Sequence, residues 1–265
     1  MEIWLGFVIT GVFAGFISGL LGIGGGVIIV PALAYLFVNQ QIPHEFIMHA
    51  ATASSLAIMV LTTLIAALSH HRHEPIRWPL YWRFFPGLIV GACSGVIIAH
   101  FLHSNVLRII FAVFLLLVAA KLFLRHKARP DVQLPGRLGL TLSAYGIGTA
   151  ASLLGIGGSI FMTPYLLHHH ISVRQTVVIA VTSSFTIALI GATVSVITGL
   201  SVVGMPAWSS GYIFWPAVIG VTLPSVISVP FGAWAAHQVN TDFLQYIFAS
   251  LLLLISVHLI LSVWH

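Results

Sequence analysis

The chain has 265 residues and a formal net charge of +5, with 59% hydrophobic and only 6% charged residues. Soluble domains usually carry about 25% charged residues, so this composition excludes a soluble globular protein and predicts an all-α, polytopic membrane protein. The positive charge does not indicate nucleic-acid binding, because eight of the ten Lys and Arg residues fall within 72–83 and 121–137. Positive charge in such loops fixes membrane orientation. Cys93 is the only cysteine, which excludes an intramolecular disulfide and a cysteine-based metal site.

Charge-free stretches define the predicted membrane segments, because one bilayer crossing needs roughly 20 apolar residues. Each half is predicted to begin with a hairpin whose tip is rich in glycine, followed by three spans. The predicted elements are 3–20, 27–38, 46–69, 84–102, 106–123, 138–154, 160–169, 173–198, 212–236 and 243–264. The N-terminus lacks a basic region and a convincing cleavage site, so no signal peptide is expected.

A glycine-rich segment occurs twice: residues 20–33 recur as 153–166, and each copy has a proline at the same place. Interior glycines cost a helix about 1 kcal/mol each, so both copies predict a broken helix that restarts within the membrane. The N–H groups at the start of the new helix and its positive dipole end favour an anion. The predicted anion ligands are Gly24, Gly25, Gly26, Gly157, Gly158 and Ser159. Close helix packing through small residues is the alternative explanation.

The repeat extends beyond the glycines. Ala51–Ser55 matches Ala180–Ser184, and each segment places hydroxyl groups in an otherwise apolar span. We expect these hydroxyls to line the anion site, whereas hydrogen bonding to the preceding turn or between helices is the alternative. The candidate residues are Thr52, Ser54, Ser55, Thr182, Ser183 and Ser184. The predicted organisation is a first membrane repeat over 1–126, a basic cytoplasmic linker over 127–137 and a second membrane repeat over 138–265.

The two repeats are predicted to be inverted in the membrane. Loop 70–83 carries three arginines, whereas its repeat equivalent, 199–211, carries no charge. This contrast is expected if the two loops lie on opposite sides of the membrane. Segments 70–83 and 121–137 are then cytoplasmic. A parallel arrangement of four plus four crossings moves only Arg174 among the basic residues and stays open as the alternative.

Titratable residues constrain the substrate. The five acidic residues all lie at a terminus or in a loop, which disfavours a cation substrate and agrees with an anion. Histidine runs such as His168–His170 are interpreted as loop residues, and no metal site is expected. His100 and His237 are repeat-equivalent and are the candidates for proton coupling. Arg83 and Arg108 are interpreted as interfacial side chains, with attraction of anions at a cavity mouth as the alternative.

The duplicated Leu-Leu-Gly-Ile-Gly-Gly segment with its following proline, and the Ser/Thr-rich helix after each copy, resembles the TauE/SafE family of sulfite exporters. The resemblance implies transport of sulfite, organosulfonates or related sulfur-containing anions; the second copy departs from the first by Ser159 in place of Gly26. We therefore expect a secondary transporter, and an exporter, in a bacterial inner-membrane setting. Its expected partners are a small anion and the lipid bilayer, without a cofactor or nucleic acid.

Three other functions stay open at this point. An anion channel would use the same glycine tips. A histidine-dependent metal-ion transporter is disfavoured by the positions of the carboxylates. An intramembrane enzyme is disfavoured because the sequence contains neither a G-x-S-x-G elbow nor an H-E-x-x-H motif.

Overall fold

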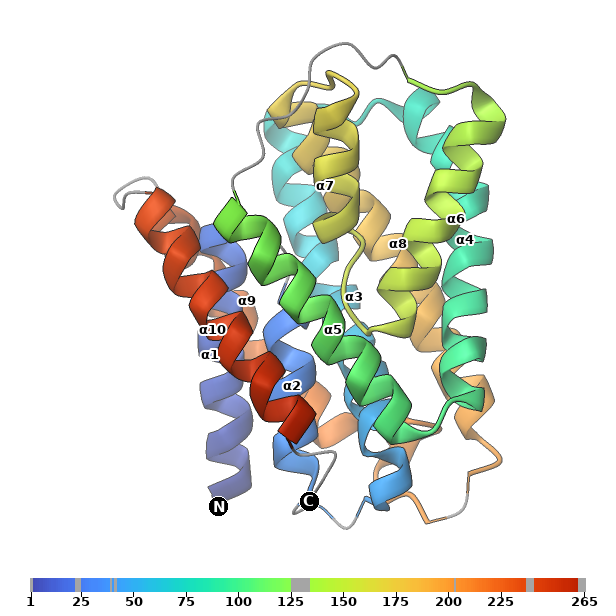
Figure 1. Ribbon diagram of the computed structural model, residues 1–265, viewed down its shortest axis with the longest axis vertical. Helices are drawn as coiled ribbons and strands as arrows, with labels where there is room; N and C mark the ends of the chain where they lie inside the picture. Colours follow the sequence, from blue (N-terminus) through green and yellow to red (C-terminus); the bar gives the residue numbers. More distant parts are fainter. Residues whose placement is uncertain are drawn as a thin grey trace.

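The structure is a computed structural model that describes residues 2–21, 25–38, 40, 42–124, 134–202, 204–236 and 241–261. Over these residues the chain is almost entirely helical, which confirms the predicted all-α class (Figure 1). The elements are α1 (Glu2–Leu21), α2 (Gly26–Phe37), the 3₁₀ helix η1 (His44–Phe46), α3 (Ile47–His73), α4 (Trp78–Phe101), α5 (Ser104–Leu124), α6 (Arg137–Leu153), α7 (Ser159–His168), α8 (Val173–Gly199), β1 (Ser209–Ser210), β2 (Ile213–Phe214), α9 (Trp215–Ala236) and α10 (Thr241–Leu261).

Six of the described helices are long and apolar enough to cross a membrane: α1, α3, α4, α5, α8 and α9. Two shorter apolar helical segments, Gly26–Phe37 and Phe248–Leu261, accompany them. These segments agree with a multi-pass membrane protein. The predicted linker lies mostly outside the described residues.

Two predicted helix starts differ from the observed ones by three residues or more, and in both cases a proline explains the difference. Helix α4 begins at Trp78, not at residue 84, because Pro79 is well suited to the first turn of a helix. Arg83 therefore lies inside this helix. Helix α9 begins at Trp215, directly before Pro216, and the predicted start of this span forms the short antiparallel pair of β1 and β2 instead.

Helices that correspond in the two halves run in opposite directions, and the two halves are interleaved. In Figure 1, α3 and α5 begin at the end of the molecule where the N-terminus lies, whereas α8 and α10 begin toward the opposite end. Helix α1 packs on α9, and its counterpart α6 packs on α4; α3 packs on α8, and α5 on α10. The first helix of each half thus packs mainly on a helix of the other half.

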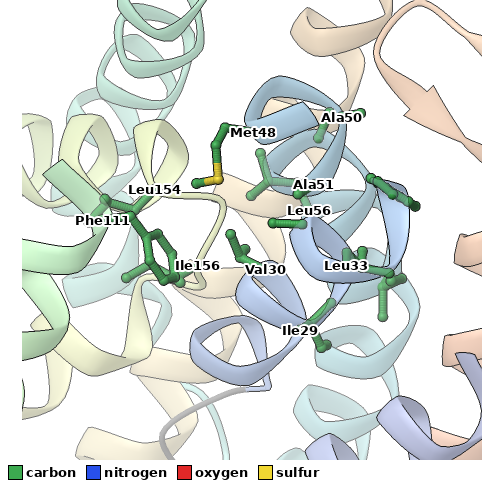
Figure 2. Packing of buried hydrophobic residues seen from close by; sticks show 14 of the residues in the cluster. Ile29, Val30, Leu33, Met48, Ala50, Ala51, Leu56, Phe111, Leu154 and Ile156 are labelled. Carbon is green, nitrogen blue, oxygen red and sulfur yellow. The ribbon is translucent and has the colours of Figure 1, made fainter. Parts of the chain in front are cut away.

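The central core joins α2, α3, α5 and the segment between α6 and α7. Figure 2 shows Leu154 and Ile156 of this segment beside Phe111 of α5, facing Val30 of α2 and Leu56 of α3. All five side chains are buried. The second glycine-rich segment is therefore held inside the protein, where a broken helix is tolerated within a membrane.

Candidate functional site

The second glycine-rich segment ends α6 with a defined cap. Gly155 has φ +66°, its N–H donates to Ser152 O at 3.1 Å, and the Ile156 N–H donates to Ala151 O at 2.9 Å. This pair of bonds is a Schellman motif, whose left-handed residue is usually glycine. A Cβ at Gly155 would also lie 2.5 Å from Thr52 Cα on α3. Gly155, which was not among the predicted ligands, is thus the residue that breaks the helix.

A serine from another helix caps the helix that follows. Helix α7 starts at Ser159, with Gly158 as its N-cap, and Gly158 offers no side chain to bind the free N–H groups. The Ser159 N–H instead donates to Ser184 Oγ of α8 at 2.8 Å, and the Ser184 hydroxyl donates to Ala180 O at 2.8 Å. Ser184 therefore takes the role of an N-cap side chain. One N–H group predicted to bind an anion is occupied by a protein hydroxyl in this conformation.

The first glycine-rich segment meets the second. Gly24 lies outside the described residues, and α2 begins at Gly26 with Gly25 before it. A Cβ at Gly26 would lie 2.9 Å from Ile156 Cα and 3.0 Å from Gly155 O. The two segments are far apart in the sequence, yet their backbones are in direct contact.

Both segments lie near the midpoint of the longest helices. Met59, close to the middle of α3, has its Sδ 3.0 Å from the position of a Cβ on Gly26, and its Cε would overlap a Cβ on Gly157. A Cβ on Gly158 would lie 2.5 Å from Ile187 Cδ1, close to the middle of α8. Met59 fills the space between the segments, and the flexible methionine side chain suits this role. Sequence reasoning missed Met59, because a methionine in an apolar span carries no distinguishing pattern.

The first hydroxyl cluster connects α3 to the other half. Ser55 Oγ donates to Gly155 O at 2.7 Å, and Ser54 Oγ accepts from the Phe214 N–H at 3.1 Å. The hydroxyl of Thr52 donates to His49 O at 3.1 Å, within its own helix. Ser55 thus reaches the glycine segments directly, whereas Ser54 supports the entry to α9.

The second cluster divides differently. Thr182 Oγ1 donates to Val178 O at 2.8 Å, which is the structural alternative of bonding to the preceding turn. Ser184 caps α7, as described above. Ser183 Oγ is buried and has no hydrogen-bond partner among the described residues. A buried hydroxyl without a partner is uncommon and is available to a ligand.

The predicted proton-coupling residue His100 belongs to an aromatic cluster at the end of the molecule that carries the N-terminus. His100 Nδ1 lies 2.9 Å from the Tyr212 hydroxyl oxygen, and the ring of His49 stacks on Tyr212 with 5.2 Å between centroids. The His49 Nε2–H donates to Ala99 O and Leu102 O at 2.9 and 3.0 Å. His49 was missed by sequence reasoning, although it precedes the first hydroxyl cluster in α3. His237 lies outside the described residues.

A cavity of about 440 Å³ opens beside this cluster. Its lining residues are His44, Glu45, Phe46, His49, His100, Phe101, Leu102, His103, Ser104 and Asn105. Burial raises the pKa of the Tyr212 phenol above its ordinary value, so this hydroxyl stays protonated beside His100. Within the described part of the chain, no three His, Cys, Asp or Glu side chains are arranged to hold a metal ion.

Comparisons with known proteins agree with this architecture. The family model described as "Sulfite exporter TauE/SafE" matches residues 7–259. A protein of Haemophilus influenzae named "probable membrane transporter protein" is 30% identical over 96% of this chain and 97% of its own length. A relative with the same description in Methanocaldococcus jannaschii is 25% identical over 92% of this chain and 91% of its own length. No solved structure matches the chain.

Proposed function

Because the chain belongs to the sulfite exporter TauE/SafE family of membrane transporters, we propose that it is a secondary transporter of a small sulfur-containing anion such as sulfite or an organosulfonate. The observation that carries this proposal is the meeting of the two glycine-rich segments near the midpoint of α3 and α8. Broken helices that meet at mid-depth in a duplicated protein are typical of substrate sites in secondary transporters.

The chemistry of the proposed site suits an anion with several oxygen atoms. Helix N-termini at Gly26 and Ser159 direct N–H groups and positive dipole ends toward the site. Serine hydroxyls from α3 and α8 surround the second segment, and Ser183 has a hydroxyl to donate. The acidic residues of the chain all lie outside the predicted spans, which agrees with an anionic substrate.

The described conformation is closed at this site. Met59 occupies the space beside Gly26 and Gly157, and the Ser184 hydroxyl accepts a hydrogen bond from the Ser159 N–H. We propose that substrate entry displaces the Met59 side chain and that the anion then competes with Ser184 for the helix N-terminus. Glycines in α4 lie directly against the α6 backbone, so this pair moves as one unit during alternating access.

The inversion of the two halves in the membrane is part of the same proposal. It is supported by the opposite directions of α3 and α8 and by the reciprocal packing of α1 on α9 and α6 on α4. The contrast in charge between 70–83 and 199–211 agrees with it. His100 is the proposed proton-coupling residue. It is hydrogen-bonded to Tyr212 and lies beside the cavity at the end of the protein that carries the N-terminus.

The proposal is tested with purified protein and a ligand panel of sulfite, thiosulfate, sulfate, a two-carbon sulfonate, chloride and Zn²⁺ at matched ionic strength. A ligand present at 100 times its Kd stabilises the folded state by about 2.7 kcal/mol, which is measured as a rise in Tm. We expect one sulfur anion to stabilise the protein and chloride to leave it unchanged. Stabilisation by Zn²⁺ alone would overturn the proposal.

Transport in liposomes then separates a transporter from a channel. A secondary transporter coupled to protons moves the selected anion faster under an imposed pH gradient, and its rate saturates with substrate concentration. A transport rate that does not depend on the pH gradient and depends only on the membrane potential would favour the anion channel.

A further inference from the structure

A second cavity is lined by the beginnings of α4 and α6. Both helices begin at the end of the molecule opposite the N-terminus (Figure 1). The volume of the cavity is about 410 Å³, and it is separate from the glycine segments and from the histidine cavity. Helix α4 contributes Pro79, Trp82, Arg83 and Pro86, and helix α6 contributes Arg137 and Thr141. Two arginines thus share one cavity.

The backbone places the two arginines side by side, at the same depth along the pair of helices α4 and α6. Thr141 Oγ1 lies 3.0 Å from Arg137 O and 3.3 Å from Arg83 O, so one hydroxyl links both backbones. A side chain at Gly87 would overlap Thr141 O, which shows how closely α4 and α6 approach one turn deeper. The spacing of the two arginine backbones is therefore set by a tightly packed helix pair.

Positive electrostatic potential accumulates in this cavity. Arg137 is the first residue of α6, and Arg83 lies in the second turn of α4, so both cations lie near the positive dipole end of a helix. Among the described residues that line the cavity, none is acidic. A cation at a helix N-terminus is unfavourable unless an anion accompanies it, so this arrangement favours a bound anion.

The depth of the cavity identifies the source of the anion. The membrane-spanning part of α4 begins at Trp78, so the cavity lies within the first turns of a span, where the headgroup region is expected. Trp82 is 55% exposed and stacks with Trp78, as in the aromatic belt of membrane proteins. We propose that this cavity binds the phosphate of an anionic phospholipid, with Arg83 and Arg137 as its ligands and Trp82 against the glycerol and acyl chains.

The second repeat does not duplicate this site. The repeat equivalents of Arg83 and Arg137 are Gly220 and Trp4, at the other end of the protein. The arginine pair is thus not required by the duplicated fold, and the proposed lipid binds on one side of the membrane.

The test uses purified full-length protein and native mass spectrometry with added phosphatidylglycerol, cardiolipin or phosphatidylcholine. We expect the anionic lipids to be retained in preference to phosphatidylcholine. Each substitution, Arg83→Gln or Arg137→Gln, should weaken retention about fivefold, since one arginine near an anionic surface contributes about 1 kcal/mol. Arg174→Gln is the matched control, because Arg174 is exposed in the first turn of α8 at the same end but does not line the cavity.

Inorganic phosphate is added in a separate arm to distinguish a free anion from a lipid. Retention of phosphatidylglycerol that inorganic phosphate does not displace supports the proposal. Displacement of the lipid by millimolar phosphate, equal retention of phosphatidylcholine, or an equal loss in the Arg174→Gln control would overturn it. Size-exclusion profiles and Tm values in detergent alone verify that each variant is folded.

Discussion

Ser55 and Ser184 occupy equivalent positions in the two repeats, yet their hydroxyls converge on the same glycine-rich segment. Ser55 Oγ of α3 donates to Gly155 O, and Ser184 Oγ of α8 accepts from the Ser159 N–H. The second segment is therefore held at its start by one repeat and at its end by the other. A duplicated sequence pattern has given two different hydrogen bonds, and together they fix one segment at the centre of the protein.

Gly155 is the position where we expect the largest effect on stability. Gly155→Ala places a Cβ at φ +66° and against Thr52 Cα, so it should lower the free energy of unfolding by about 2–4 kcal/mol. The matched control is Gly146→Ala inside α6, the helix that Gly155 ends, where a Cβ meets no described atom within 4 Å. This control should be neutral or stabilising by up to about 1 kcal/mol. Thermal unfolding of both variants measures the difference, and equal Tm values would contradict the proposed cap.

The next largest effect is expected as a difference in stability between variants of the adjacent serines Ser183 and Ser184 of α8. Ser184→Ala removes the cap of α7 and should cost about 1–2 kcal/mol. Ser183→Ala removes a buried hydroxyl that has no partner in the described part of the chain, and should leave stability unchanged within about 0.5 kcal/mol. If Ser183 binds substrate as proposed, its variant will instead weaken anion affinity. A Ser183→Ala variant that loses as much stability as Ser184→Ala would contradict this distinction.

Ser55→Ala should have a smaller effect than Ser184→Ala. It leaves Gly155 O without the hydrogen bond from α3, at a cost of about 1 kcal/mol. Because Ser55 and Ser184 hold the same segment, the double variant should lose more stability than the sum of the two single variants. A double-mutant cycle measures this coupling, and strict additivity would show that the two serines act independently.

The smallest expected effect is a dependence on pH at high values. Burial raises the pKa of Tyr212, so the unfolded chain ionises this phenol first as pH rises above about 10. The stability that Tyr212 contributes is present below that pH and is lost above it. Tyr212→Phe should remove this part of the alkaline loss, which parallel Tm measurements from pH 8 to 11 will detect. An identical alkaline slope in both proteins would exclude Tyr212 as a contributor.

Much of the fold followed from the sequence because bilayer crossing requires long apolar segments, which charge-free stretches reveal. The break of α6 was also readable, since a run of glycines cannot continue a helix at low cost. The role of Gly155 as the left-handed cap residue could not be predicted, because it depends on the exact residue at which the helix ends. Met59 and His49 gave no usable signal: their importance comes from contacts between distant segments. The earlier start of α4 and the later start of α9 depended on prolines that suit a first turn.

We propose that the two glycine-rich segments together form one anion site near mid-depth. This proposal is tested most directly by titrating the sulfur anion selected by the ligand panel onto Gly158→Leu and Gly146→Leu by calorimetry. Gly158 precedes the first turn of α7, whereas Gly146 lies on an exposed part of α6. We predict that the Gly158 variant stays folded and loses affinity at least about tenfold, a free-energy change of about 1.4 kcal/mol, while the Gly146 variant binds as the wild type does. Unchanged affinity in the Gly158 variant would contradict the account.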